Sequence, residues 1–281
     1  MIKPQWVVGA CVGLLLCGNI AAEGLDKIKE KGALRVALYK DFPPYSFVDA
    51  AQKTRGVDVD IARALAAKLG VSLEQMAVTA GESMVDDLRN SVWKGHYLGG
   101  GVADVMLHVP VDARFAEDNP KVKIFAPYFQ EQVTLAYNPK RIPNLPSLQV
   151  LLDHKVGVEL DSVASVFLIS TMQGLLRNSV KHYPRFSEAL EAFQKGEVSA
   201  VMGQRGQIES GLAKDQPVIY SESPMPGLIQ KWTVGLAVKA DNPVLATELE
   251  QAMKTLQKDG TLAKIFAEYH VNYTPVEEAK P

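Results

Sequence analysis

Cysteine is scarce in this sequence. The 281 residues contain two cysteines, Cys11 and Cys17, and both precede Glu23. Residues 1–22 combine a short positive segment, an apolar stretch over residues 6–16 and small residues before Glu23, which is typical of a cleaved signal peptide. Cleavage after residue 22 leaves a mature chain without thiols. That excludes disulfides, thiolate metal sites and cysteine nucleophiles.

A long hydrophobic run is also absent. The apolar stretch over residues 6–16 is too short to span a bilayer, and charge begins at Asp26 without a stop-transfer pattern. The pattern therefore favours export of the chain over a membrane anchor. Lipidation of Cys17 is the alternative, although Leu16 stands where a lipid-attachment signal requires a small residue.

The charged residues form no basic run, and the formal net charge is −2. The sequence therefore lacks the positive surface that a nucleic-acid partner requires. The chain has 5 histidines with no two at i, i+3 or i, i+4 spacing, so we expect no metal site and no cofactor. An apolar fraction of 47% and a charged fraction of 22% are typical of a folded α/β protein.

An apolar segment followed by two prolines is the most informative local pattern. Residues 34–39 form an expected buried strand, and the Pro-Pro pair at 43–44 must end it because proline donates no hydrogen bond to a sheet. Phe42 and Tyr45 flank this pair, so we expect them on a rigid loop at the carboxyl end of the strand. Open α/β sheets bind ligands at that edge. Tyr39, Phe42 and Tyr45 are therefore candidate ligand contacts, and the alternative is that these rings cap a hydrophobic core.

Strands and helices alternate along the rest of the chain. A helix over residues 58–69 places apolar residues on one face and ends at Gly70, and Asn242 with Pro243 begins another. This alternation predicts an α/β fold with mainly parallel sheets covered on both faces. Further strands are expected over residues 71–78, 103–109, 122–127, 155–159, 198–202 and 232–238, and further helices over residues 83–92, 162–176, 186–195 and 262–269.

Several motifs in a fixed order carry a resemblance to a known family. They are LRVALYKDFPPYSF, GVDVDIARALAAKLGV, FSEALEAFQKGEVSAVM, WTVGLAVKADNP and LQKDGTLAKIFAEY. Over about residues 34–271 the chain resembles the family 3 periplasmic solute-binding proteins, known as amino-acid receptors of ABC importers. The resemblance implies the periplasm as the location, and we expect a monomer because no heptad run or long exposed apolar helix is present.

The same resemblance implies the type II periplasmic-binding fold. This is a two-lobed clamshell in which each lobe is a mainly parallel sheet flanked by helices and the ligand lies in the cleft. Two crossing segments between the lobes would allow a bending closure. The implied division is lobe 1 over residues 23–131 and 235–273, lobe 2 over 132–234, hinges at 132–137 and 231–238, and a flexible tail over 274–281.

The residues that hold an amino acid in this family are partly missing. The resemblance places His108 and Arg114 in the stretch that holds the ligand carboxylate, but Arg114 arrives two residues early and the usual threonine is absent. Gln204 stands where an acidic residue pairs with the ligand ammonium, and Ser162 matches a hydroxyl at a helix start. Glu159 is expected beside the same cleft. The alternatives are a surface ion pair for Arg114, a polar strand residue for Gln204 and a helix cap for Ser162.

An insertion over residues 93–101, WKGHYLGGG, departs from the family pattern. Together with DVMLHVPVD it resembles the J-type proteins encoded with quinoprotein methanol dehydrogenases. That resemblance implies docking on a periplasmic quinoprotein dehydrogenase or a c-type cytochrome, and the alternative is a solvated surface loop. The expected docking residues are Trp93, His96, Tyr97 and Leu98.

Three functions follow from these observations. The main hypothesis is a non-catalytic accessory protein of a PQQ-dependent methanol or alcohol dehydrogenase system. The alternative is the substrate-binding receptor of an ABC importer, which takes an amino acid or another small polar solute and meets an ABC permease. A third reading, an enzyme on the same scaffold, needs a buried acid–base pair in the cleft, and Glu159 is the one candidate carboxylate there.

Overall fold

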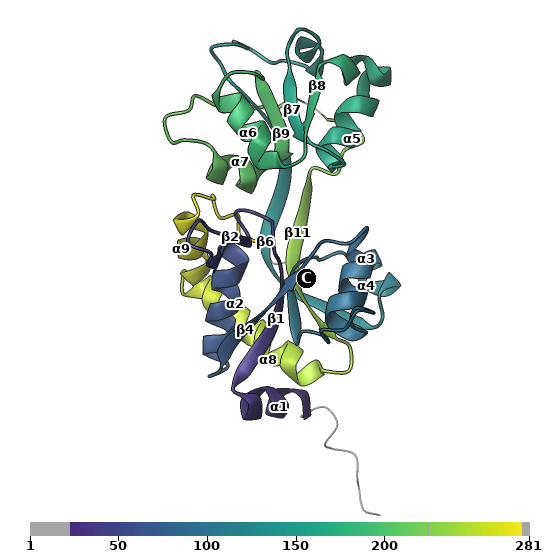
Figure 1. Ribbon diagram of the computed structural model, residues 1–281, viewed down its shortest axis with the longest axis vertical. Helices are drawn as coiled ribbons and strands as arrows, with labels where there is room; N and C mark the ends of the chain where they lie inside the picture. The colour runs from purple at the N-terminus through teal and green to yellow at the C-terminus, as the bar shows by residue number, and fades with distance from the viewer. Residues whose placement is uncertain (1–22, 224, 277–281) are drawn as a thin grey trace, which may run out of the picture.

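The computed structural model describes residues 23–223 and 225–276. The expected signal peptide, both cysteines and lipidation at Cys17 lie outside these residues. Two lobes are stacked along the long axis of the molecule, and two long strands run between them (Figure 1). Within the described ranges, no helix has the length and apolar character needed to cross a membrane.

The strands of both lobes belong to one continuous sheet. Their order is β4-β1-β5-β11-β6-β9-β7-β8, with β10 paired to β6, and β2 and β3 form a separate hairpin. The pairs β1/β4, β1/β5, β7/β8 and β7/β9 are parallel, whereas β11 and β6 are antiparallel to their neighbours. The strands are β1 (Ala33–Tyr39), β2 (Phe47–Val48), β3 (Thr54–Arg55), β4 (Ser72–Val78), β5 (Val105–Pro110), β6 (Val122–Tyr137), β7 (Val156–Glu159), β8 (Val180–Tyr183), β9 (Ala200–Gln204), β10 (Ile219–Tyr220) and β11 (Lys231–Lys239).

Helices cover both faces of the sheet in each lobe (Figure 1). One core of lobe 1 packs α2, α8 and α9 against β1 and β6, and a second lies on the other face beneath α3. Lobe 2 likewise has two cores, one on each side of β9. The α-helices are α1 (Glu23–Lys31), α2 (Val57–Lys68), α3 (Met84–Leu88), α4 (Ala113–Asp118), α5 (Val163–Ser170), α6 (Phe186–Gln194), α7 (Arg205–Gly211), α8 (Pro243–Lys258) and α9 (Thr261–Glu268). Shorter helical segments are η1 (Arg89–Trp93), η2 (Leu148–Asp153) and η3 (Thr171–Asn178).

The two crossing strands join the lobes directly. In β6 and β11, Gln132 pairs with Lys231 and Glu131 with Trp232, and the register shifts between Val234 and Leu236. Trp232 packs against the cores of both lobes. The backbone is hydrogen-bonded on both strands at the crossing. Closure of the lobes by bending of this ribbon stays a prediction.

The structure differs from the sequence-based prediction at one helix in lobe 2. The helix predicted over residues 162–176 ends at Ser170, because Met172, Gln173 and Gly174 all have positive φ. The Ser170 hydroxyl donates to the carbonyls of Val166 and Phe167, which closes the last turn. The apolar periodicity continues beyond the break, so sequence periodicity alone did not reveal it.

The start of α8 matches its prediction. The side chain of Asn242 accepts a hydrogen bond from the backbone N–H of Leu245 at 3.4 Å, and Pro243 occupies the first turn. Gly70 and Gly196, the predicted ends of α2 and α6, have φ values of 75° and 73°.

We expect Asn242→Ala to lower the free energy of unfolding by about 1 kcal/mol, because an N–H at the start of α8 loses its acceptor. Chemical denaturation measures the change. Asn242→Asp keeps an oxygen at the same position and serves as the matched control. An alanine variant as stable as the aspartate variant would show that the cap does not contribute.

Candidate functional site

The loop after β1 is held firmly in lobe 1. The N–H of Phe42 donates to the carbonyl of Ser46 at 2.8 Å, and the N–H groups of Tyr45 and Ser46 donate back to the carbonyl of Phe42. The carbonyl of Tyr45 also accepts the N–H of Asp58 at 2.8 Å, which ties the loop to the first turn of α2. Phe42 is thereby fixed at the carboxyl end of β1, facing lobe 2.

Lobe 2 supplies the opposing wall from the ends of its own strands. Glu159 ends β7, Gln204 ends β9, and Ser162 begins α5. The Ser162 hydroxyl accepts the N–H of Ser165 at 3.1 Å and donates to the carbonyl of Glu159 at 2.8 Å. Ser162 therefore acts as a helix cap, the alternative weighed for it, and it also lines the cleft.

Two adjoining pockets lie between the lobes and share Phe42 and Glu159. The pocket nearer lobe 2 has a volume of about 310 Å³, and the pocket towards the end of β4 has a volume of about 480 Å³. Each is lined by residues of both lobes, so closure of the lobes would change its shape. The lining includes Tyr39, Lys40, Asp41, Phe42, Glu159, Asp161, Ser162, Phe186, Gln204 and Trp232.

Burial raises the pKa of Glu159, and the negative charge of Asp41 raises it further, while a hydrogen bond from the N–H of Phe186 acts in the opposite direction. Asp41 belongs to lobe 1 and Glu159 to lobe 2, and both line the larger pocket. Two carboxylates from opposite lobes thus line one pocket.

Tyr45 and His108 do not line either pocket but lie beneath Phe42. The rings of Phe42 and His108 meet edge to face with centroids 5.0 Å apart, and those of Tyr45 and His108 lie 4.4 Å apart. Tyr45 is fully buried and His108 is 7% exposed. The prediction that they contact a ligand directly therefore differs from their position: these rings support the floor of the cleft.

A buried network of ionisable groups surrounds His108. Its Nδ1 lies 3.0 Å from Oδ2 of Asp58 and its Nε2 lies 4.0 Å from Oε2 of Glu131. The Tyr128 hydroxyl donates to Oδ1 of Asp58 at 2.8 Å, and the Tyr45 hydroxyl donates to Glu131. Burial lowers the pKa of His108, but Asp58 and Glu131 raise it more, so the net shift is upward.

Sequence reasoning did not identify Asp58 and Glu131 as members of this network. Asp58 is 2% exposed on the inner face of α2. Its position between the buried Val57 and Val59 was the available signal. Glu131, on the crossing strand, is fully buried, and no pattern in the sequence marked it.

Arg114 is separated from the cleft. It lies on the short helix α4, is exposed, and lines neither pocket between the lobes. The two-residue displacement seen in the sequence places its Cα on the helix beyond β5 and not at the strand end. The structure therefore places at the cleft Tyr39, Phe42, Glu159, Ser162 and Gln204 from the predicted ligand set.

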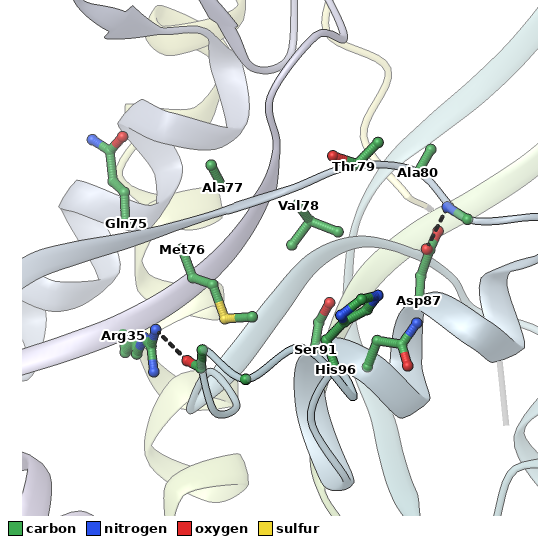
Figure 2. Close-up of a pocket in the computed structure, with 14 residues that line it drawn as sticks. Arg35, Gln75, Met76, Ala77, Val78, Thr79, Ala80, Asp87, Ser91 and His96 are labelled. Atoms are coloured by element: carbon green, nitrogen blue, oxygen red, sulfur yellow. Dashed lines mark hydrogen bonds between the residues drawn. The ribbon is translucent and has the colours of Figure 1, made fainter.

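The insertion borders a third pocket, in lobe 1, with a volume of about 630 Å³ (Figure 2). This pocket shares Val78, Thr79 and Ala80 with the larger pocket of the cleft. Arg35 donates to the carbonyl of Gly100 at 2.8 Å and anchors the loop, and His96 lines the same pocket. Trp93 packs into a core of lobe 1, whereas Tyr97 and Leu98 are 87% and 77% exposed. Of the four predicted docking residues, Trp93 is packed in lobe 1, His96 lines the pocket, and Tyr97 and Leu98 form an exposed tip.

Comparisons of sequence and of structure find that this chain is similar to solute-binding proteins. The sequence profile of the bacterial extracellular solute-binding proteins, family 3, matches residues 34–93. The probable ABC transporter arginine-binding protein ArtJ of Chlamydia trachomatis serovar D is 24% identical over 96% of this chain and 98% of its own length. The solved structure of an ancestral cationic amino acid solute-binding protein, AncCDT-1, has a TM-score of 0.70 at 22% identity and covers 88% of this chain and 99% of its own.

One similarity is to an enzyme but is confined to a short segment. Cyclohexadienyl dehydratase of Pseudomonas aeruginosa is 41% identical over 66 residues, 25% of its length.

The structural match to AncCDT-1 shows the type II periplasmic-binding fold, as predicted from the sequence. ArtJ and the L-cystine-binding protein TcyJ of Escherichia coli, which is 24% identical over 92% of this chain, are named as amino-acid-binding proteins, and they do not show the J-type subgroup. The chain is thus similar to the family 3 solute-binding proteins over residues 34–93, and to amino-acid-binding relatives of the same fold over most of its length.

Proposed function

We propose that this protein is an exported, non-catalytic receptor that closes its lobes around a small polar solute and presents it to an ABC permease. The observation that carries this proposal is a cleft with walls from both lobes, crossed by the paired strands β6 and β11. Family 3 proteins are extracellular by description, and relatives spanning the chain are named for arginine and cystine binding. Those names support an amino acid or a chemically similar solute as the ligand and the periplasm as the location.

Ligand binding is expected to raise the melting temperature. A solute at about 100 times its Kd stabilises the folded state by about 2.7 kcal/mol, which corresponds to a shift of about 5–10 °C for a chain of this size. The measurement is a thermal-shift screen with amino acids and small amines, followed by small-angle scattering with the best solute. We expect the radius of gyration to fall on binding. A screen without any stabilising solute, and scattering that does not change, would contradict a receptor role.

The second candidate function is the accessory role expected from the insertion. The specific observation in its favour is the exposed apolar tip formed by Tyr97 and Leu98. The test is co-purification of the full mature chain with a periplasmic quinoprotein dehydrogenase or a c-type cytochrome. A complex that is lost in the Tyr97→Ser/Leu98→Ser variant would support the role, whereas separate elution of both proteins would contradict it.

A further inference from the structure

The charged side chains of the cleft are mainly acidic. Asp41 from lobe 1 and Glu159 and Asp161 from lobe 2 line the two pockets, against one cationic side chain, Lys40. Among the described residues that line these pockets there is no arginine. The cleft therefore lacks the forked cationic side chain that best recognises a carboxylate.

The two facing carboxylates oppose closure of the empty cleft. Asp41 and Glu159 line one pocket from opposite lobes, and the charge on Asp41 makes ionisation of Glu159 less favourable. Closing the lobes shortens the distance between these groups and lowers the local dielectric, so their repulsion grows. A cation bound between Asp41 and Glu159 is attracted to both carboxylates and offsets the repulsion between them. A positively charged solute thus binds the closed state better than the open state.

The neutral groups of the cleft also suit a positively charged donor. The amide Oε1 of Gln204 is buried in the wall of the smaller pocket and has no hydrogen-bond donor among the described residues. Phe42 is shared by both pockets, and Phe186 and Trp232 line the smaller one. Aromatic faces attract cations and cover the apolar stem of an alkyl amine. The Gln204 oxygen and the rings are independent of the acidic residues and favour the same ligand chemistry.

We propose that the cleft selects its solute by positive charge, taking an alkyl amine or guanidine for which a carboxylate is dispensable. This inference rests on the proposed receptor function and specifies its ligand. Two features of the cleft suit an anion: the side chain of Lys40, and the start of α5 at Ser162, whose backbone N–H groups lie at a helix N-terminus. Pairs of an amine and the corresponding amino acid distinguish the contribution of the ligand's positive charge from that of its carboxylate.

The test is isothermal titration calorimetry of the mature protein with agmatine and L-arginine, and with cadaverine and L-lysine. Each pair differs by the carboxylate alone. We expect the amine of each pair to bind at least as tightly as its amino acid. Amines that bind more than about tenfold more weakly, a difference of about 1.4 kcal/mol, would overturn the inference and leave the receptor function standing. Absence of binding by all four compounds, together with a negative solute screen, would overturn the receptor function itself.

Two substitutions test the proposed cation contacts. Glu159→Gln and Asp41→Asn are each expected to weaken agmatine binding about tenfold, because each removes one charge-assisted contact. Glu188→Gln is the matched control, since Glu188 pairs with Arg185 on α6 and lines neither pocket of the cleft. Thermal unfolding verifies that each variant is folded. Agmatine affinities of both cleft variants within twofold of the control would overturn the inference.

Discussion

Replacing Gly56 with alanine is expected to lower the free energy of unfolding by about 4 kcal/mol, combining backbone strain with overpacking. Gly56 has a φ of 137°, a conformation that residues with a Cβ rarely adopt. A Cβ at this position would lie 2.1 Å from the carbonyl oxygen of Tyr45 and 2.8 Å from the N of Ser46. These neighbours are backbone atoms of the hydrogen-bonded loop, so they cannot rotate away as a side chain would.

The same substitution is expected to affect the cleft. Gly56 precedes α2, and its N–H donates to the Tyr269 hydroxyl at 3.0 Å. The next two N–H groups, of Val57 and Asp58, donate to the carbonyls of Pro44 and Tyr45 in the loop. A shift at Gly56 therefore moves the loop that positions Phe42. We expect the variant to lose both stability and solute affinity.

Gly70→Ala is the matched control for Gly56→Ala. Gly70 also has a positive φ, 75°, but a Cβ at this position would have no atom within 4 Å. We expect this change to cost about 1 kcal/mol, the strain of the backbone conformation alone. Chemical denaturation of both variants measures the difference. Equal losses at the two positions would contradict the proposed clash with the Tyr45 carbonyl.

Local patterns predicted much of the fold. The Pro-Pro pair located the end of β1, and the glycines at 70 and 196 located the ends of α2 and α6, because each depends on a conformation of the local backbone. The break after Ser170 and the helix α7 directly after Gln204 were not predicted. Both depend on how lobe 2 packs, which a single sequence does not encode in its periodicity.

The sequence predicted those cleft residues that lie at or near the carboxyl end of a strand. Phe42, Glu159 and Gln204 reach the cleft because the carboxyl ends of β1, β7 and β9 face the other lobe. The network around His108 was not predicted, since its members come from a helix, a strand and the crossing strand β6. Contacts between residues so distant in the sequence require the three-dimensional arrangement.

Removing the charge of Asp58 is expected to destabilise the protein strongly. Asp58→Asn leaves His108 without its nearest counter-ion in a buried site, and loss of one partner of a buried ion pair costs about 3–5 kcal/mol. The Tyr128 hydroxyl, which donates to Asp58, limits the rearrangement open to the asparagine. Urea denaturation at pH 6.5 measures the loss, and a variant within about 1 kcal/mol of the wild type would contradict a charged His108, since that is the range of an exposed pair.

The pH dependence of stability distinguishes this ion pair from a purely steric role. The folded-state pKa of His108 is raised above its ordinary value of about 6.5, so its contribution is fully present below pH 6.5 and is lost as pH rises through the folded pKa. Glu131 also has a raised pKa, chiefly through burial, and acts in the same direction. The wild type should therefore lose stability as pH rises above about 6.5.

In Asp58→Asn the net shift of the His108 pKa is expected to change from upward to downward. Burial then outweighs the remaining attraction of Glu131, the pKa of His108 falls below about 6.5, and the folded state excludes a proton that the unfolded chain binds. Stability of the variant should rise as pH approaches about 6.5 and then level off, whereas that of the wild type should fall above about pH 6.5. His96→Gln, on the exposed loop, is the control and should keep the wild-type slope. Parallel slopes for the wild type and Asp58→Asn would show that Asp58 does not hold the proton on His108, because a steric effect changes stability equally at every pH.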